Sequence, residues 1–324
     1  MGLAFEERIL PLEAFVALHP AAQELVEASR YSELTPGGVQ GLLASWEHNL
    51  ELLSDLATFV QQQGMEHSLW REKQVSLREV SVLPPVVRPT KMLFAGANYE
   101  RHVREVDNWK EGQLGGPDVK NFSVDKSTTR PYVFIKLPYC LIGPYDAVIH
   151  PRPYQQLDWE GELALIIGKR GKYIPVERAM EYVAGFTIAN DYSLRSMNMR
   201  ADWPGLRSDW FGGKNFDTAA CLGPYLVPRA FVPNYLNLGR RLLVNGVVKQ
   251  DASTEGMIFK PDEIISFVSS IVTLEPGDVI ATGSPPGAGF ASGEYLGVGD
   301  VVELQMEGLG RQRNVIVAEE GGDV

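Results

Sequence analysis

The sequence contains little cysteine and has a shortage of positive charge. Its two cysteines, Cys140 and Cys221, lie far apart in apolar stretches and form no CxxC pair or regular spacing. We therefore expect no disulfide framework and a reducing environment for the protein. Lys and Arg together number 30 against 41 Asp and Glu, which gives a formal charge of -11. This acidic balance argues against nucleic acid or an anionic membrane as a partner.

Long hydrophobic runs are also missing. The N-terminus, MGLAFEERIL, mixes apolar residues with early acids, so we predict neither a signal peptide nor a membrane span. A chain of 324 residues is long enough for two domains, or for one large domain with an appendage. The sequence thus predicts a cytoplasmic protein with a sizeable core.

The chain changes character near residue 85. Residues 9–15 could form a short strand, and from Val39 apolar residues recur at helical spacing, so residues 1–85 are predicted to be a small N-terminal helical or α/β domain. Residues 82–91, VLPPVVRPTK, hold three prolines and are typical of a linker. Residues 86–324 are predicted to form a second domain.

Short runs of β-branched and aromatic residues, bounded by turn residues, dominate the second part of the chain. Asn245-Gly246 predicts a hairpin, and two Gly-Asp turns at 277–278 and 299–300 each precede a strand pattern. Helical stretches are expected at 176–183 and 261–268. The fold class predicted is α+β, with a β-rich core that is mixed rather than doubly wound.

Two glutamates lie at the start of an unusually apolar run, LDWEGELALIIG, residues 157–168. In a β-strand Glu160 and Glu162 share one face, and the residues that follow are apolar on both faces, as in a buried strand. Two carboxylates there need a cation, or one of them must hold a proton. The alternative is that Asp158, Glu160 and Glu162 line the exposed end of an edge strand.

A third acid, Asp191, ends the apolar run AGFTIAND after a β, helix, β passage. It could return to the same edge as the two glutamates. Three carboxylates form an oxygen-only site that suits Mg²⁺, Mn²⁺ or Ca²⁺, and leave about half of an octahedron for water or a chelating substrate.

His102 and Glu105 are three residues apart, which brings their side chains together on a helix. A carboxylate that orients an imidazole raises its basicity, as a general base requires. The alternative is a solvated helix on which this spacing is incidental. Residues 109–129 are polar and contain glycine, so we predict a lid over the site at about 100–130.

Two further segments suggest polar groups in a pocket. Lys214, in GGKNFDTAACLGP, could hold an anion or a developing oxyanion, or could equally be a surface lysine on a turn. The loop ATGSPPGAGF, from Ala281, follows a strand and offers the Thr282 hydroxyl as a donor to substrate.

Together these motifs resemble the fumarylacetoacetate hydrolase family from about Lys91 to Val317. They occur in the family's order: GANYERHVREV, VFIKLP, DWEGELALIIGKR, YVAGFTIANDYSLRS, GGKNFDTAACLGPYLV, LLVNGVVKQDASTEGMIF and LEPGDVIATGSPPGAG. The resemblance implies a mixed β-roll, or β-sandwich-like, catalytic fold that usually dimerises, here with an extra N-terminal domain.

The resemblance also implies roles for particular residues. It places Mg²⁺ or Mn²⁺, with Ca²⁺ possible in crystals, on Glu160, Glu162 and Asp191. It makes His102, Glu105 and Lys214 catalytic. The substrate-binding residues that it implies are Asn98, Tyr99, Lys136, Arg195 and Thr282.

The chain departs from the family pattern at several positions. Ser196 replaces an acid in SLRS, and TGSP stands where the family often has TGTP. Residues 197–213, with Trp203 and Trp210, are expected to reshape the pocket.

The function predicted is metal-dependent hydrolysis of a carbon-carbon bond in a 2,4-dioxo acid or a similar 1,3-diketone, with a small-molecule substrate and a homodimeric enzyme. The same chelated enolate also serves decarboxylation of oxaloacetate, or isomerisation or hydration of a 2-hydroxy-diene-dioate. A further alternative is that the site is a relic and the protein only binds a metabolite or a partner.

Overall fold

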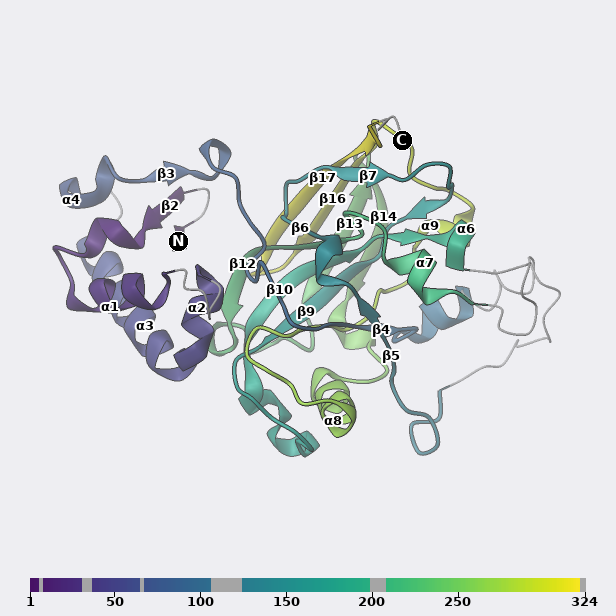
Figure 1. Ribbon diagram of the computed structural model, residues 1–324, viewed down its shortest axis with the longest axis horizontal. Coiled ribbons are helices and arrows are strands. Elements are labelled where there is room, and N and C mark those ends of the chain that lie inside the picture. Colours follow the sequence, from purple (N-terminus) through teal and green to yellow (C-terminus); the bar gives the residue numbers. More distant parts are fainter. Residues whose placement is uncertain (6–7, 31–36, 65–66, 106–123, 199–207, 321–324) are drawn as a thin grey trace.

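Two β-sheets packed face to face form the centre of the computed structural model (Figure 1), which describes residues 1–5, 8–30, 37–64, 67–105, 124–198 and 208–320. In spatial order the larger sheet contains β5 (Tyr132–Lys136), β4 (Met92–Gly96), β15 (Val279–Ala281), β9 (Gly161–Ile167), β10 (Val183–Asp191), β12 (Ala220–Pro228) and β6 (Leu141–Ile142). The second sheet contains β14 (Val247–Ser253), β13 (Gly239–Val244), β16 (Val301–Met306), β17 (Gly310–Ala318) and β7 (Val148–His150).

Strand β9 lies inside the larger sheet, between β15 and β10, and each of its residues is buried. Leu163 and Leu165 pack into the apolar core between the two sheets, which also contains Leu304 of β16. Ala164 and Ile166 alternate with them and face the other side of the sheet, where they join two other apolar clusters. The alternative of an exposed edge strand is therefore wrong, because every residue of β9 is buried and residues 164–166 have a paired strand on each side.

The sheets mix parallel and antiparallel pairs. Strand β9 is antiparallel to β10 and β15, whereas β15 is parallel to β4 and β12 is parallel to β6. This confirms the predicted mixed α+β fold.

The predicted turns are confirmed. Asn245 and Gly246 have φ of 51° and 78° and connect β13 to β14 as a two-residue hairpin. Gly277 and Gly299 have positive φ in the Gly-Asp turns before β15 and β16.

Most predicted helices are present, with two differences. The stretch predicted at 176–183 is a 3₁₀ helix, η5 (Val176–Tyr182), while α8 (Pro261–Ile271) is longer than predicted. Residues 9–15 divide at Pro11, where β2 ends and a 3₁₀ helix, η1 (Leu12–Phe15), begins, because proline provides no N–H to extend the sheet. The other 3₁₀ helices are η2 (Leu43–Ser45), η3 (Leu77–Glu79), η4 (Pro138–Cys140), η6 (Arg229–Phe231) and η7 (Thr254–Gly256).

Residues before the proline-rich stretch form a small group of their own. It contains β1 (Gly2–Phe5), β2 (Arg8–Pro11), β3 (Val75–Ser76), α1 (Pro20–Ala28), α2 (Val39–Leu42), α3 (Trp46–Gln63) and α4 (Ser68–Arg71). Leu25, Leu56 and Trp70 lie in its apolar core, which continues onto Ile166 and Ala184 of the larger sheet. A domain boundary at residue 85 stays a prediction.

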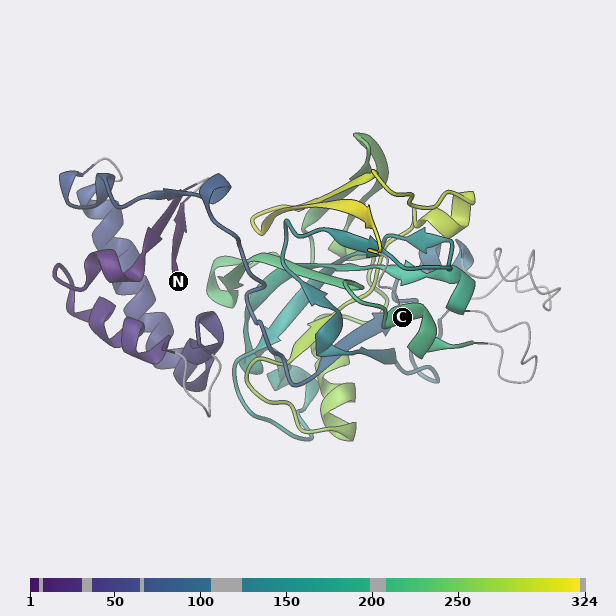
Figure 2. The ribbon, with the colours of Figure 1, turned by 45° about the horizontal axis from the view of Figure 1, so that its top comes forward.

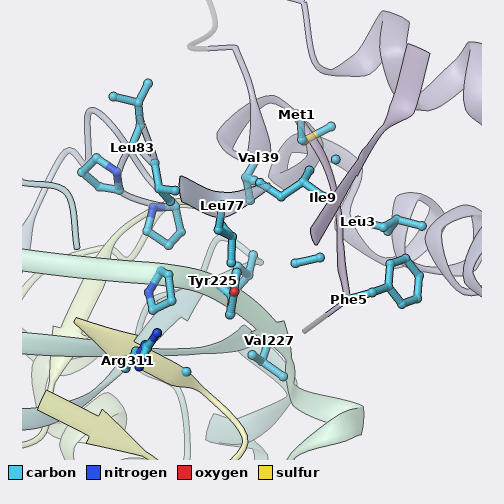
Figure 3. A pocket seen from close by; sticks show the side chains of 18 of the residues that line it. Met1, Leu3, Phe5, Ile9, Val39, Leu77, Leu83, Tyr225, Val227 and Arg311 are labelled. Carbon is cyan, nitrogen blue, oxygen red and sulfur yellow. The ribbon is translucent and has the colours of Figure 1, made fainter. Parts of the chain in front are cut away.

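The N-terminal group lies at the opposite end of the sheets from α6 (Arg195–Asn198) and α7 (Trp210–Lys214), as Figures 1 and 2 show. A cleft of about 1740 Å³ separates it from β12 and β17. Figure 3 shows the side chains of Leu3 and Phe5 on one side of this cleft, and those of Tyr225 and Arg311 on the other. Among the described residues no helix is long and apolar enough to span a membrane.

Candidate metal and acid-base site

Three carboxylates meet where β9 begins and β10 ends. Glu160 immediately precedes β9, Glu162 is its second residue and Asp191 is the last residue of β10. The strands are antiparallel with Glu162 opposite Ala189, and the Asp191 amide donates to the Glu160 carbonyl at 2.9 Å. One carboxylate oxygen from each acid lies within 4.8 Å of the others, and all three side chains are buried.

Buried cations surround these acids. Lys214, from α7, contacts Glu160 Oε2 and Asp191 Oδ2 through its Nζ, both at 2.6 Å. Lys136, from β5, contacts Asp191 Oδ1 at 2.6 Å. Arg195, from α6, pairs with Glu160 and with Asp158, the latter at 2.8 Å. Lys214 is therefore not a surface lysine, and the like charges of the acids are offset by cations even without a metal ion.

The two glutamates have opposite electrostatic environments. Burial raises the pKa of Glu160, but Arg195, Lys214 and His102 outweigh it and hold this pKa well below its ordinary value. Burial raises the pKa of Glu162 well above its ordinary value, and the charges of Asp191 and Glu160 raise it further. Glu162 accepts a hydrogen bond from the Gly283 amide at 2.7 Å, and no ion pair joins it to a lysine or arginine in the described part of the chain. Glu162 is thus the acid in greatest need of a cation.

The donor set fits a hard divalent cation. Three carboxylate oxygens lie within 4.8 Å of one another. Adjacent ligands of an octahedral Mg²⁺ are about 2.9 Å apart for bonds of about 2.0–2.1 Å, so these side chains would draw closer together around an ion. Oxygen-only ligands favour Mg²⁺, Mn²⁺ or Ca²⁺ over softer metals.

His102 lies next to these acids and is buried. Its Nε2 is 3.9 Å from Glu160 Oε1, and its Nδ1 is 3.4 Å from Glu105 Oε2. The edge of the Phe290 ring packs against the imidazole, with 5.6 Å between ring centroids. The alternative of a solvated helix does not hold for His102, since its imidazole faces the carboxylates. Glu105, whose side chain is 24% exposed, lies on the outer side of the pair.

The loop after β15 holds three acids through its backbone amides. Gly283 N donates to Glu162 at 2.7 Å, and Gly287 N donates to both carboxylate oxygens of Glu105 at 3.0 and 3.1 Å. At the start of α9 (Gly289–Ser292), Gly289 N donates to Asp158 at 2.6 Å. The sequence indicated only a substrate-lining turn here, because glycine letters do not reveal where amides point.

The predicted substrate-binding residues divide into two groups. Lys136 and Arg195 contact the acids directly. Asn98 and Thr282 bond to each other and to the chain: Asn98 Nδ2 donates to the Thr282 carbonyl at 2.7 Å, and the Thr282 hydroxyl donates to the Leu163 carbonyl at 2.9 Å. Tyr99 is buried and stacks on Arg240. Their roles toward substrate stay predictions.

Two predicted features lie partly outside the described residues. Residues 106–123 of the predicted lid lie outside the described residues, and so does Trp203. Within the described residues, 100–105 are helical, and Trp210 stacks near Phe134 with 4.8 Å between ring centroids.

Sequence reasoning missed several residues that position the site. Asp158 holds Arg195, and Asn215 accepts a hydrogen bond from the Leu137 amide at 2.6 Å, which ties the helix of Lys214 to the strand of Lys136. Gln250 and Arg240 hold Gly161 from the second sheet. The alternation of residues in β13 could have predicted that Arg240 is buried, because it lies on the same face of the strand as the buried Leu242 and Val244.

Replacement of Glu162 by Gln is expected to stabilise the metal-free protein and to remove its metal response. The pKa of Glu162 in the folded state lies above its ordinary value of 4.5, so its contribution to stability falls as pH rises through the interval between the two. The glutamine side chain does not ionise, so the variant should not lose stability in this way as pH rises. Its neutral amide is, however, a poor ligand for Mg²⁺. Thermal unfolding at pH 5–8 in EDTA and in Mn²⁺ measures both effects.

For the wild type, Mn²⁺ at 100 times its dissociation constant adds about 2.7 kcal/mol of stability, which Glu162→Gln should lack. Glu51→Gln, at an exposed position in α3, is the control and should behave as the wild type. A Glu162→Gln protein less stable than the wild type in EDTA near neutral pH contradicts the assigned electrostatics.

Comparison with known proteins agrees with this geometry. The family described as "Fumarylacetoacetate (FAA) hydrolase C-terminal" matches residues 91–317. Oxaloacetate tautomerase FAHD2A, mitochondrial, of Bos taurus is 43% identical over 241 residues, which are 74% of this chain and 70% of that protein. Names of this kind locate those relatives in mitochondria, and the cytoplasmic expectation for this chain stays a prediction.

Solved structures give the same fold. A 2-hydroxyhepta-2,4-diene-1,7-dioate isomerase from Mycobacterium marinum is 29% identical with a TM-score of 0.61, covering 76% of this chain and 82% of that one. Fumarylpyruvate hydrolase from Pseudomonas aeruginosa, in complex with Mn²⁺ and pyruvate, is 27% identical with a TM-score of 0.59, covering 71% of this chain and 91% of that one. With a family match over most of the chain and this site at its centre, the protein belongs to the fumarylacetoacetate hydrolase family.

Proposed function

We propose that this enzyme interconverts the keto and enol forms of oxaloacetate or a closely similar 2-oxo dicarboxylate, with Mg²⁺ or Mn²⁺ as cofactor. The observation that carries the proposal is a buried imidazole, held by a carboxylate, 3.9 Å from an oxygen of the candidate metal site. Relatives about 40% identical are named oxaloacetate tautomerases, which supports this substrate.

Glu160, Glu162 and Asp191 are the residues that would hold the cofactor. A divalent cation bound there supplies a Lewis acid that polarises the 2-oxo group of a substrate. The residues of the chain then have to move one proton and to stabilise negative charge on one oxygen.

His102 is the proposed general acid-base residue. Its Nε2 faces the carboxylates, so a substrate bound there presents its C3 proton to the imidazole. Glu105 accepts from Nδ1 and fixes the tautomer in which Nε2 is free to take the proton. The same imidazole returns the proton to carbon or to the enol oxygen, which completes the tautomerisation without a water molecule.

Lys214 and Arg195 are proposed to stabilise the enolate oxygen. Burial lowers the pKa of Lys214, but Asp191 and Glu160 raise it more, so the ammonium stays charged. Positive groups fixed in a buried site stabilise a developing anion more strongly than they do in water.

Hydrolysis of a carbon-carbon bond is the second candidate. The fumarylpyruvate hydrolase with Mn²⁺ and pyruvate shares the fold. In hydrolysis His102 would instead take a proton from water, which adds to the distal carbonyl of a diketone. The bond between that carbon and C3 then breaks, and the enolate that leaves takes up a proton. Decarboxylation of oxaloacetate and isomerisation of a diene-dioate use the same enolate. The homodimer implied by the family is also a proposal for this chain.

A small substrate panel separates these reactions. Oxaloacetate, fumarylpyruvate and another acylpyruvate are incubated with Mg²⁺, Mn²⁺ or EDTA, while enol absorbance, CO₂ and product acids are followed. Metal-dependent equilibration of enol and keto oxaloacetate, without CO₂ release and without cleavage of the diketones, supports the proposal. Rapid release of a cleaved acid from an acylpyruvate, with no acceleration of oxaloacetate tautomerisation, replaces it with the hydrolase.

Replacement of His102 by Ala is expected to lower kcat for oxaloacetate tautomerisation by about 10²–10⁴-fold, because it removes the proposed proton carrier. Mn²⁺ binding should persist, since His102 is not one of the three carboxylate ligands. His48→Ala, on the exposed face of α3, is the matched control and should retain wild-type rates. Unchanged kcat in folded His102→Ala eliminates His102 as the acid-base residue.

Replacement of Gly287 by Ala is expected to reduce kcat by about 10²-fold through misplacement of Glu105. Gly287 has φ +99°, and an added Cβ there lies 2.1 Å from the Lys249 carbonyl oxygen, so the loop has to move. Gly299→Ala is the control, because Gly299 has a similar φ of +96° but open space around it. Equal kcat in the two variants shows that the Gly287 amide does not orient the base.

A further inference from the structure

Among the described residues, no strand pairs with the first residues of β9 on one side. Strand β10 pairs with β9 as far as Gly161, whereas β15 pairs only with residues 164–166. Gly161 lies between Glu160 and Glu162, and its N–H and C=O face the open side. Unpaired main-chain groups in a buried strand are costly, so other partners have to replace the missing strand.

The β13–β14 hairpin of the second sheet provides these partners. Gln250 Oε1 accepts from Gly161 N at 3.0 Å, and Arg240 Nη1 donates to the Gly161 carbonyl at 2.9 Å. Gln250 also donates to Ser284 Oγ at 2.9 Å and to the Pro285 carbonyl at 3.0 Å, in the loop whose amides hold Glu162 and Glu105. The hairpin therefore connects the start of β9, beside Glu160 and Glu162, to the loop after β15 that holds Glu105.

Arg240 is unusual among the cations of this region. It is 3% exposed, and its guanidinium lies 4.8 Å from the centre of the Tyr99 ring. Its Nε and Nη2 have no hydrogen-bond partner among the residues that the structure describes. Lys136, Lys214 and Arg195 each form an ion pair with an acid, but within the described ranges Arg240 forms none. Such a buried charge is retained at a cost in stability, which calls for a functional reason.

Glu160 and Glu162 are the residues on either side of the peptide that this contact holds. Gly161 accepts from Arg240 through its carbonyl and donates to Gln250 through its amide. These two bonds fix the backbone between the two glutamates, and the backbone sets where both carboxylates lie. Glu162 is also the carboxylate of the three without an ion pair in the described structure.

We propose that Arg240 is a positioning residue for metal binding: its bond to the Gly161 carbonyl fixes the start of β9, and with it the placement of Glu160 and Glu162. This inference rests on the proposed metal site and not on the proposed reaction. Residues that orient metal ligands typically contribute about 10–100-fold to metal affinity.

The test is Mn²⁺ affinity, measured from the EPR signal of free Mn²⁺ for the full-length protein without substrate. Arg240→Met has an unbranched side chain without charge and without a hydrogen-bond donor. The Mn²⁺ affinity of this variant is expected to fall about 10–100-fold. Arg240→Lys keeps the charge but cannot both stack on Tyr99 and reach Gly161 with a planar fork, so a smaller loss is expected. Thermal unfolding in EDTA shows whether each variant is folded.

Arg241→Met is the matched control, because Arg241 is the next residue of β13, is 48% exposed and pairs with Asp251 on the outer surface. It should bind Mn²⁺ as the wild type does. A role of Arg240 in stability alone lowers Tm in EDTA but leaves the affinity of the folded protein within about twofold of the wild type, which overturns the proposal.

If Arg240→Met does not fold, the Mn²⁺ affinity of Arg240→Lys is the test, and an affinity within about twofold of the wild type overturns the proposal. A wild type that binds no Mn²⁺ overturns both the metal site and this inference. Normal Mn²⁺ binding that is weakened in the variants, together with absence of tautomerase activity, supports the inference and rejects only the proposed reaction.

Discussion

The arrangement of the site depends on one constraint: carboxylates at the start of a buried strand have to be matched by positive charge. Strand β9 brings Glu160 and Glu162 into the interior, and β10 adds Asp191 beside them. Isolated, these charges are too costly to bury, so α6, α7 and β5 each contribute a cation to the same point. The short helices after β10 therefore have an electrostatic role as well as a packing one. Glu162 is the acid left without an ion pair in the described chain, so a cation bound at these acids would offset its charge.

Backbone groups and a second sheet complete this balance. The loop after β15 directs amides at Glu162, Glu105 and Asp158. One segment therefore holds a candidate metal ligand, the carboxylate beside His102 and the partner of Arg195. The β13–β14 hairpin reaches the same strand through Gln250 and Arg240. Displacement of either element would thus disturb both the candidate metal ligands and the His102–Glu105 pair, so metal affinity and turnover have to be measured separately.

Family membership defines the chemistry of this site more closely than its substrate. Tautomerisation, isomerisation, decarboxylation and hydrolysis can each pass through the enolate of a 2-oxo acid, but they form it by breaking different bonds. The first two break a C–H bond, decarboxylation breaks the bond to the carboxylate, and hydrolysis breaks a C–C bond after water has added. The N-terminal group of elements lies far from α6 and α7, at the other end of the sheets, so it does not choose among these outcomes by contact with the acids in the structure described.

The sequence by itself determined the buried strand at 161–167, the Asn245-Gly246 hairpin and the mixed β-rich core, because apolar periodicity and turn residues are local properties. Residue types and order also indicated the three acids and the His102–Glu105 pair. Only the tertiary structure decided that Lys136 and Lys214 contact the same carboxylate, that backbone amides of one loop hold three acids, and that Arg240 supports β9 from another sheet. Lys136 and Asp191 are 55 positions apart and Arg240 and Gly161 are 79 apart, and side-chain pairing at such separations depends on strand order and register, which no local pattern specifies.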